Sequence, residues 1–149
     1  MKFKKSILVF FIMPIVLCSC GKVTYGSYPF INDESEITQI QIVYFNGYPS
    51  QGYTVERELT EEERKDFWSD FNEITFGMVD RFLDPADIHK EYSLVFVYDN
   101  GDREFVAIGA TYLVYSGESL EKGDYYWRGI WFENQQDFED LLSKYLEEE

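Results

Sequence analysis

The chain has 149 residues, a length typical of one domain, and 19% of them are aromatic, enough to fill a hydrophobic core. It carries 28 acidic against 13 basic residues, a formal net charge of −15 at pH 7. This balance opposes binding to nucleic-acid phosphates and to anionic lipid surfaces, so we expect no nucleic-acid partner. Solubility, a cationic protein or a cationic ligand would each account for the acidity.

The first twenty residues have the layout of an export signal. Met1 to Lys5 is a short basic segment, and Ser6 to Leu17 is an apolar run too short to span a membrane as a helix. The run ends in Leu17-Cys18-Ser19-Cys20. This segment resembles the lipobox of bacterial lipoproteins, with an aliphatic residue at −3, a small residue at −1 and a cysteine at +1. Cys18 at −2 departs from the usual Ala, Ser or Thr.

The resemblance implies that residues 1–19 are cleaved and that Cys20 becomes a lipid-anchored N-terminus carrying diacylglycerol and palmitate. Two or more acyl chains on one residue anchor a protein stably. The implied location is the extracytoplasmic side of the cell membrane, or the outer membrane in a host that has one. The alternative is an uncleaved anchor helix with two incidental cysteines.

Cleavage would also change the composition of the chain. It removes three lysines and no acidic residue, which leaves 10 basic against 28 acidic residues and a net charge of −18. Both cysteines lie at the cleavage site, so the folded part has no thiol for a disulfide, a nucleophile or a metal site.

Residues 20–35 predict a flexible tether, because turn-forming residues recur there without a sustained hydrophobic period. A coil of about 15 residues spans roughly 20 Å, enough to lift a domain clear of the lipid head groups. Folding of Tyr28, Phe30 and Ile31 back onto the domain would shorten it.

Residues 36–45 and 53–59 alternate between apolar and polar residues and predict two strands of a hairpin. The residues expected on one face are Ile40, Ile42 and Tyr44 in the first strand, and Tyr53, Val55 and Leu59 in the second. Thr60 and Glu63 then match a capping box at a helix start. The apolar face of this helix is Phe67, Trp68, Phe71 and Ile74, and Gly77 is expected to end it.

Residues 91–108 contain two apolar runs around Asn100-Gly101, a strong signal for a two-residue type I′ hairpin turn. Such a turn predicts the pairs Phe96–Phe105 and Leu94–Ala107 on one face. It predicts Val95–Val106 and Val97–Glu104 on the other face, which the glutamate makes the less buried one.

Gly109 predicts a bulge or bend, after which residues 111–115 continue the sheet, and residues 124–132 predict the last strand. Asn134 is expected to cap a C-terminal helix with an apolar stripe formed by Phe138, Leu141, Leu142, Tyr145 and Leu146. This order predicts a two-layer α+β domain over residues 36–149. Its antiparallel sheet would have about five to six strands, with two helices on one face.

Catalytic and cofactor motifs are missing from the sequence. It has no P-loop, no G-x-G-x-x-G and no G-x-S-x-G, so we expect no cofactor and no nucleophilic catalysis. The single histidine, His89, shares a loop with Asp80, Asp84 and Asp87 that could hold a divalent cation. A solvated acidic loop is the favoured interpretation, so no metal site is predicted. Paired catalytic carboxylates remain open among 28 acidic residues.

The last predicted strand supplies a candidate binding surface. Tyr125, Trp127 and Trp131 fall on one face of it, with Arg128 beside them, and such residues often anchor protein partners. The favoured alternative is that these rings fill the sheet. The sequence therefore predicts a lipid-anchored, non-catalytic protein- or peptide-binding module. The alternatives are a cell-wall glycan-binding or hydrolase-accessory lipoprotein and a carboxylate-dependent enzyme.

Overall fold

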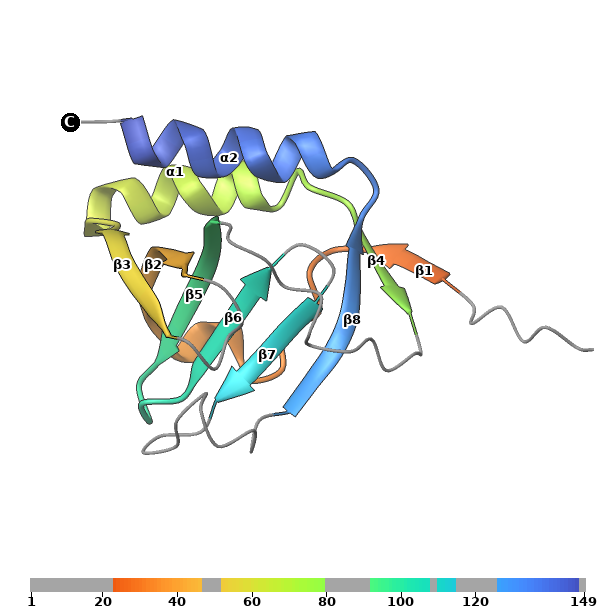
Figure 1. Ribbon diagram of the computed structural model, residues 1–149, viewed down its shortest axis with the longest axis horizontal. Coiled ribbons are helices and arrows are strands. Elements are labelled where there is room, and N and C mark those ends of the chain that lie inside the picture. The colour runs from red at the N-terminus through yellow and green to blue at the C-terminus, as the bar shows by residue number, and fades with distance from the viewer. Residues whose placement is uncertain (1–22, 47–51, 80–91, 108–109, 115–125, 148–149) are drawn as a thin grey trace, which may run out of the picture.

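The computed structural model describes residues 23–46, 52–79, 92–107, 110–114 and 126–147 (Figure 1). These residues form one antiparallel sheet with two helices along one side, which confirms the predicted α+β class and two-layer arrangement. The sheet has eight strands in the order β1-β4-β8-β7-β6-β5-β2-β3, more than the five to six predicted.

The described residues form eight strands and three helical segments. The strands are β1 (Val23–Gly26), β2 (Ile37–Phe45), β3 (Tyr53–Glu58), β4 (Phe76–Val79), β5 (Tyr92–Tyr98), β6 (Arg103–Ala107), β7 (Ala110–Val114) and β8 (Tyr126–Phe132). The helices are the single 3-10 turn η1 (Glu34–Glu36), α1 (Glu61–Phe71) and α2 (Gln135–Glu147).

The segment predicted as a flexible tether is largely part of the domain. Residues 23–26 form β1, which pairs with β4 at one edge of the sheet. Tyr28 is buried, and its ring contacts the rings of Phe71 and Phe76. The structure therefore differs from the predicted tether from residue 23 onward. Burial of large aromatic side chains offsets the conformational entropy lost on ordering the segment.

Helix α1 begins as predicted, because the Thr60 hydroxyl accepts from the Glu63 amide and the Glu63 side chain accepts from the Thr60 amide. It ends earlier than predicted, at Phe71. Gly77 lies in β4 and pairs with Tyr25 of β1, so the prediction that it ends the helix was wrong. The segment around Gly77 pairs with β1 on one side and β8 on the other, and this pairing makes it a strand. Helical periodicity in the sequence does not reveal these partners.

The central hairpin of β5 and β6 forms, but its register is shifted by one residue from the prediction. Phe96 pairs with Glu104, and Val95 pairs with Phe105. A one-residue shift moves every side chain of a strand to the other face. All four predicted pairs differ from the observed ones by this one residue. The prediction that Glu104 lies opposite Val97, on the less buried face, was wrong. Glu104 is fully buried beside the helix-side core.

The turn between the two strands has one residue more than predicted. The Gly101 amide donates to the Tyr98 carbonyl at 3.0 Å, and the Tyr98 amide donates to the Asp102 carbonyl at 2.9 Å. Three residues therefore connect the strands instead of two. A type I′ turn needs positive φ at both central residues. Gly101 has φ of +85°. No non-glycine residue in the described part of the chain has positive φ, so Asn100 does not have the positive φ that a type I′ turn needs.

Strand β3 contains a bulge that the alternating pattern does not reveal. Ile42 and Val43 are consecutive in β2, yet they pair with Arg57 and Val55, which are two apart. The extra residue reverses the alternation of side chains along β3. Leu59 therefore packs in the helix-side core, and the prediction that it shares a face with Val55 was wrong.

Strands β6 and β7 pair antiparallel, with Ala107 opposite Ala110. The chain therefore reverses direction between them, whereas the sequence predicted a bulge or bend near Gly109 in a continuing sheet. Residues 108–109 themselves lie outside the described residues.

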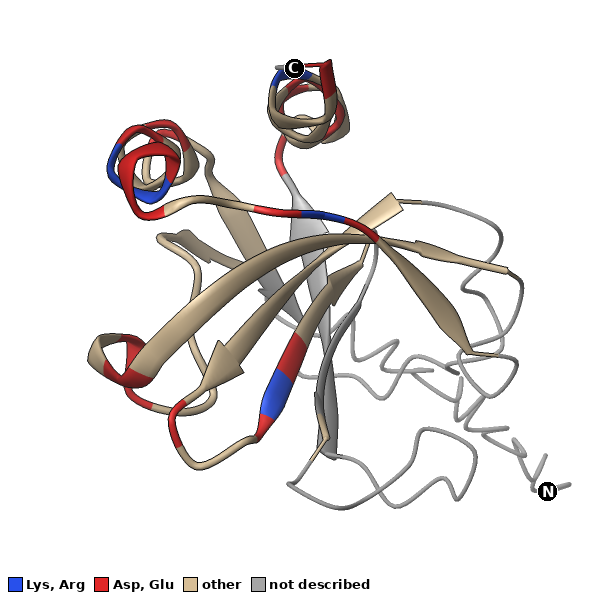
Figure 2. Ribbon diagram, turned by 90° about the vertical axis from the view of Figure 1, so that its left-hand side faces the viewer, with Lys and Arg blue, Asp and Glu red and all other residues tan. Residues whose placement is uncertain are grey.

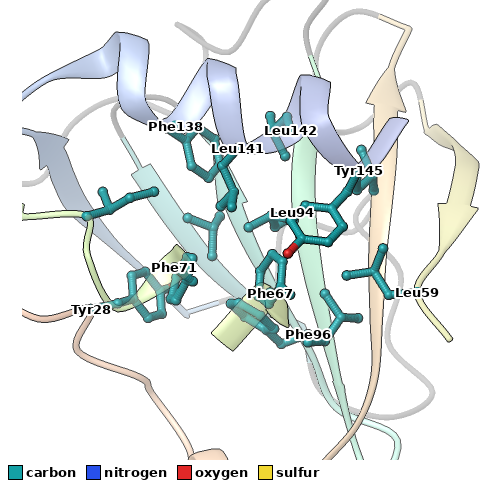
Figure 3. Close-up of a cluster of buried hydrophobic side chains, with 14 of the residues drawn as sticks. Tyr28, Leu59, Phe67, Phe71, Leu94, Phe96, Phe138, Leu141, Leu142 and Tyr145 are labelled. Carbon is teal, nitrogen blue, oxygen red and sulfur yellow. The ribbon is translucent and has the colours of Figure 1, made fainter. Parts of the chain in front are cut away.

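Helix α2 matches its prediction. The Asn134 side-chain oxygen accepts from the Gln136 amide at 3.2 Å, a capping contact. The predicted stripe packs on the sheet, and Figure 3 shows it facing the side chains of α1 and the strands. The helix-side core includes Tyr28, Leu59, Phe67, Phe71, Leu94, Phe96, Phe138, Leu141, Leu142 and Tyr145. A smaller cluster on the opposite face includes Val43, Phe45, Val95, Phe105, Ala107 and Val114.

Candidate functional site

A groove of about 410 Å³ lies between the C-terminal end of α1 and residues 137–144 of α2. It is lined by carboxylates and one cation around an apolar floor. The carboxylates are Asp70, Glu73, Asp137 and Asp140, the cation is Lys144, and the apolar residues are Ile74 and Leu141. Figure 2 shows acidic residues on both helices that flank it.

The groove exists because two amphipathic helices pack side by side on the same sheet face. Ile74 and Leu141 are 6% and 5% exposed, so they belong to the core at the base of the groove. The polar faces of the helices project beyond that core and supply the rim. Asp137 also lies in the first turn of α2, where a carboxylate stabilises the helix dipole.

Lys144 neutralises one carboxylate of the groove. Its ammonium lies 2.7 Å from Oδ2 of Asp70, and the Tyr145 hydroxyl donates to the same oxygen at 2.7 Å. The hydrogen bond from Lys144 lowers the pKa of Asp70, with a further contribution from Tyr145. A general acid needs a raised pKa, so Asp70 is shifted in the opposite direction to that role.

Two of the remaining carboxylates accept hydrogen bonds from neutral amides. Asp137 accepts from the Asn134 side chain at 2.7 Å, and Asp140 accepts from the Gln136 side chain at 2.8 Å. A neutral donor does not cancel a negative charge, so the rim stays electronegative. Among the described residues, no three His, Cys, Asp or Glu side chains gather closely enough to hold a metal ion. The acids are therefore spread along the groove.

A second polar cluster lies inside the core, around Glu104. Its carboxyl group accepts hydrogen bonds from the Tyr28 hydroxyl at 2.7 Å, the Tyr98 hydroxyl at 2.5 Å and the Ile31 amide at 3.1 Å. Glu104 is fully buried and Tyr28 is 6% exposed. These contacts join the N-terminal segment to the central hairpin, and Glu104 does not line the groove between the helices.

The residues predicted as a binding surface are only partly placed. Tyr125 lies outside the described residues. Trp127, Arg128 and Trp131 belong to β8, where Trp127 pairs with Tyr112, Arg128 with Thr111 and Trp131 with Gly77. Their use as a surface stays a prediction.

Other predicted features also stay untested. The lipidation site Cys20 and the acidic loop from Asp80 to His89 lie outside the described residues. Neither helix of the described part has the length and apolar character needed to cross a bilayer.

No pattern in the sequence predicts the groove. Its helices were predicted, but Asp70 and Asp140 are 70 residues apart, and no local pattern signals that they line one cavity. The number of acidic residues on predicted helices was the one available hint. Comparisons with protein-family models, curated proteins and solved structures find no match to this chain.

Proposed function

We propose that this protein is a lipid-anchored, extracytoplasmic binding module without catalytic activity, whose groove between α1 and α2 receives a basic segment of a protein or peptide. The single observation that carries the proposal is the excess of carboxylates over cations around this groove. The anchoring rests on the lipobox resemblance at Cys20.

Charge favours a cationic ligand. Four carboxylates face one ammonium around the groove, and that ammonium is bound to Asp70. Complementary charge speeds encounter and selects partners more than it adds affinity. A lysine or arginine side chain entering the groove would meet Glu73, Asp137 and Asp140.

The apolar floor favours a side chain with a long aliphatic stem. Lys and Arg pack their methylene groups along apolar surface while their charged ends reach polar partners. Ile74 and Leu141 provide that surface below the rim. A basic peptide segment therefore matches both layers of the groove better than a neutral glycan or a small inorganic cation does.

Cross-linking in intact host cells tests the proposal. We expect one abundant partner protein to be recovered with the parent chain and to be lost with the double variant Glu73→Gln/Asp140→Asn. Each exposed charge contact contributes about 0.7 kcal/mol, so the double variant should bind roughly tenfold more weakly. Glu73 and Asp140 are exposed, and their neutralisation leaves the fold intact.

A matched control separates the groove from general acidity. Glu56→Gln/Glu147→Gln makes the same change in net charge at two exposed residues outside the groove, and it should retain the partner. Equal loss with both variants would reject the groove as the site. Recovery of no partner with the parent chain would reject the binding module.

The lipid anchor has its own test. Cys20→Ser should release the protein from the membrane fraction and abolish acylation.

A further inference from the structure

The described domain begins very close to the predicted lipidation site. Strand β1 starts at Val23, three residues after Cys20. Its pairing is regular over its whole length, from Val23 opposite Val79 to Gly26 opposite Phe76. The chain is thus tied into the sheet from its first described residue, and Gly21 and Lys22 alone separate β1 from Cys20.

This short link limits the distance between β1 and the membrane. Three residues span at most about 11 Å when fully extended. The head-group region of one leaflet is roughly 5–8 Å thick, and the acyl chains of Cys20 begin at its inner boundary. Val23 therefore cannot lie more than a few ångströms above the head groups, in contrast to the roughly 20 Å that a free 15-residue tether would allow.

We propose that the β1 edge of the sheet lies against the lipid head groups of the membrane that carries the anchor. This inference rests on the lipid anchoring in the proposed function and adds an orientation to it. The domain stands on its β1 edge, and the opposite edge, formed by β3, points away from the membrane.

The exposed surface of β1 suits this position. Tyr25 is 59% exposed, the largest exposure among the large hydrophobic residues of the described chain. Tyrosine has an apolar ring and a polar hydroxyl, and it is enriched at the level of lipid head groups for that reason. Strand β1 is also at the edge of the sheet, and no other described strand pairs with its outer side.

The charge of the domain is compatible with this orientation. Strand β3 lies seven strand spacings from β1, roughly 34 Å along the sheet. Figure 1 shows β1 at the right-hand end and β3 with the start of α1 at the left. Exposed acids such as Glu56, Glu58 and Glu62 lie at that distant end. Their repulsion from anionic lipids is screened beyond about 8 Å at physiological salt.

Fluorescence quenching in vesicles tests the orientation. Thr24 in β1 and Thr54 in β3 are exposed threonines on the two opposite edge strands, so Thr24→Cys and Thr54→Cys form a matched pair. Each full-length variant is purified in its acylated form and labelled with a thiol-reactive fluorophore. Acylation blocks the thiol of Cys20, so the introduced cysteine alone reacts. The vesicles contain phosphatidylcholine, phosphatidylglycerol and a lipid with a quencher on its head group.

We expect loss of fluorescence for the label at position 24 and no loss at position 54. Equal quenching of the two labels, or stronger quenching at 54, would overturn the orientation. Vesicle flotation and the intact mass of the same samples report the anchor independently. An acylated, floating protein with equal quenching refutes this inference alone, whereas a protein that is not acylated and does not float refutes the anchoring as well.

Discussion

Glu104 is an acidic residue that lies fully buried in the described part of the chain. Its carboxyl group receives donors from Tyr28, Ile31 and Tyr98, which belong to two segments far apart in the sequence. Glutamate is rarely fully buried without partners. These three donors help the core to accommodate it, and its removal would take this acceptor from each of them.

We predict that Glu104→Ala destabilises the protein by about 3 kcal/mol, because it removes three hydrogen bonds that each contribute about 0.5–1.5 kcal/mol net. Urea unfolding of the purified domain measures the change. Glu56→Ala, at an exposed position in β3, serves as the control and should change stability by less than about 0.5 kcal/mol. Similar stabilities for the two variants would show that the Glu104 cluster does not hold the fold.

This cluster is not predictable from the sequence, for a physical reason. Asn100-Gly101 has the residue types of a type I′ turn, and that turn would place Glu104 on the face opposite Phe96 and Leu94. Two-residue and three-residue connections are both common in hairpins, so the turn residues alone do not choose between them. Burial of Phe105 on one face and Phe96 on the other therefore decides the register.

At the scale of elements, the turn between β5 and β6 has to fit that register. Gly101 has φ of +85°, a left-handed conformation that costs an L-residue with a side chain about 1–2 kcal/mol. We predict that Gly101→Ala lowers the stability of the protein by about that amount, measured by thermal or urea unfolding.

Gly26 offers a matched control for this substitution. It has no positive φ, and a methyl group added there would meet no atom within 4 Å. Gly26→Ala should leave stability unchanged or raise it by about 0.4–1 kcal/mol, because alanine reduces the entropy of the unfolded chain. If both alanine variants had the same effect, the left-handed conformation of Gly101 would not be what the turn requires.

At the scale of the whole molecule, the N-terminal segment is a structural part of the domain. Tyr28 is buried among aromatic rings, and Phe30 packs against Trp68 and Phe96. A chain that starts at Asn32 loses these contacts and two of the donors to Glu104. We predict that it is less stable by about 5 kcal/mol, a large share of the typical stability of a domain.

Truncation at two points measures this contribution. A chain starting at Val23 keeps β1 and the aromatic contacts, so its urea-unfolding midpoint should match that of a chain starting at Cys20 without acylation. The chain starting at Asn32 should unfold at much lower urea. If both truncated chains unfolded together, residues 23–31 would be the free tether that their composition suggests.

The groove between α1 and α2 depends on how the two helices pack in the whole molecule. Each helix was predicted from its own cap and apolar stripe, and the structure confirms the starts of both. Asp70 and Glu73 line the same groove as Asp137 and Asp140 only because both helices cover the same sheet face. Periodicity states which side of a helix is buried, but it does not state which other helix lies beside it.

The sequence by itself determined the α+β class, the two helices with their caps and most strands, because these depend on short-range periodicity and on capping and turn residues. It also contains the segment ending at Cys20 that resembles a lipobox. The tertiary structure decided the register at Glu104, the bulge in β3, the addition of β1 and β4 to the sheet and the groove between the helices. These features depend on contacts between residues far apart in the chain, whose burial energies exceed the local preferences that a sequence displays.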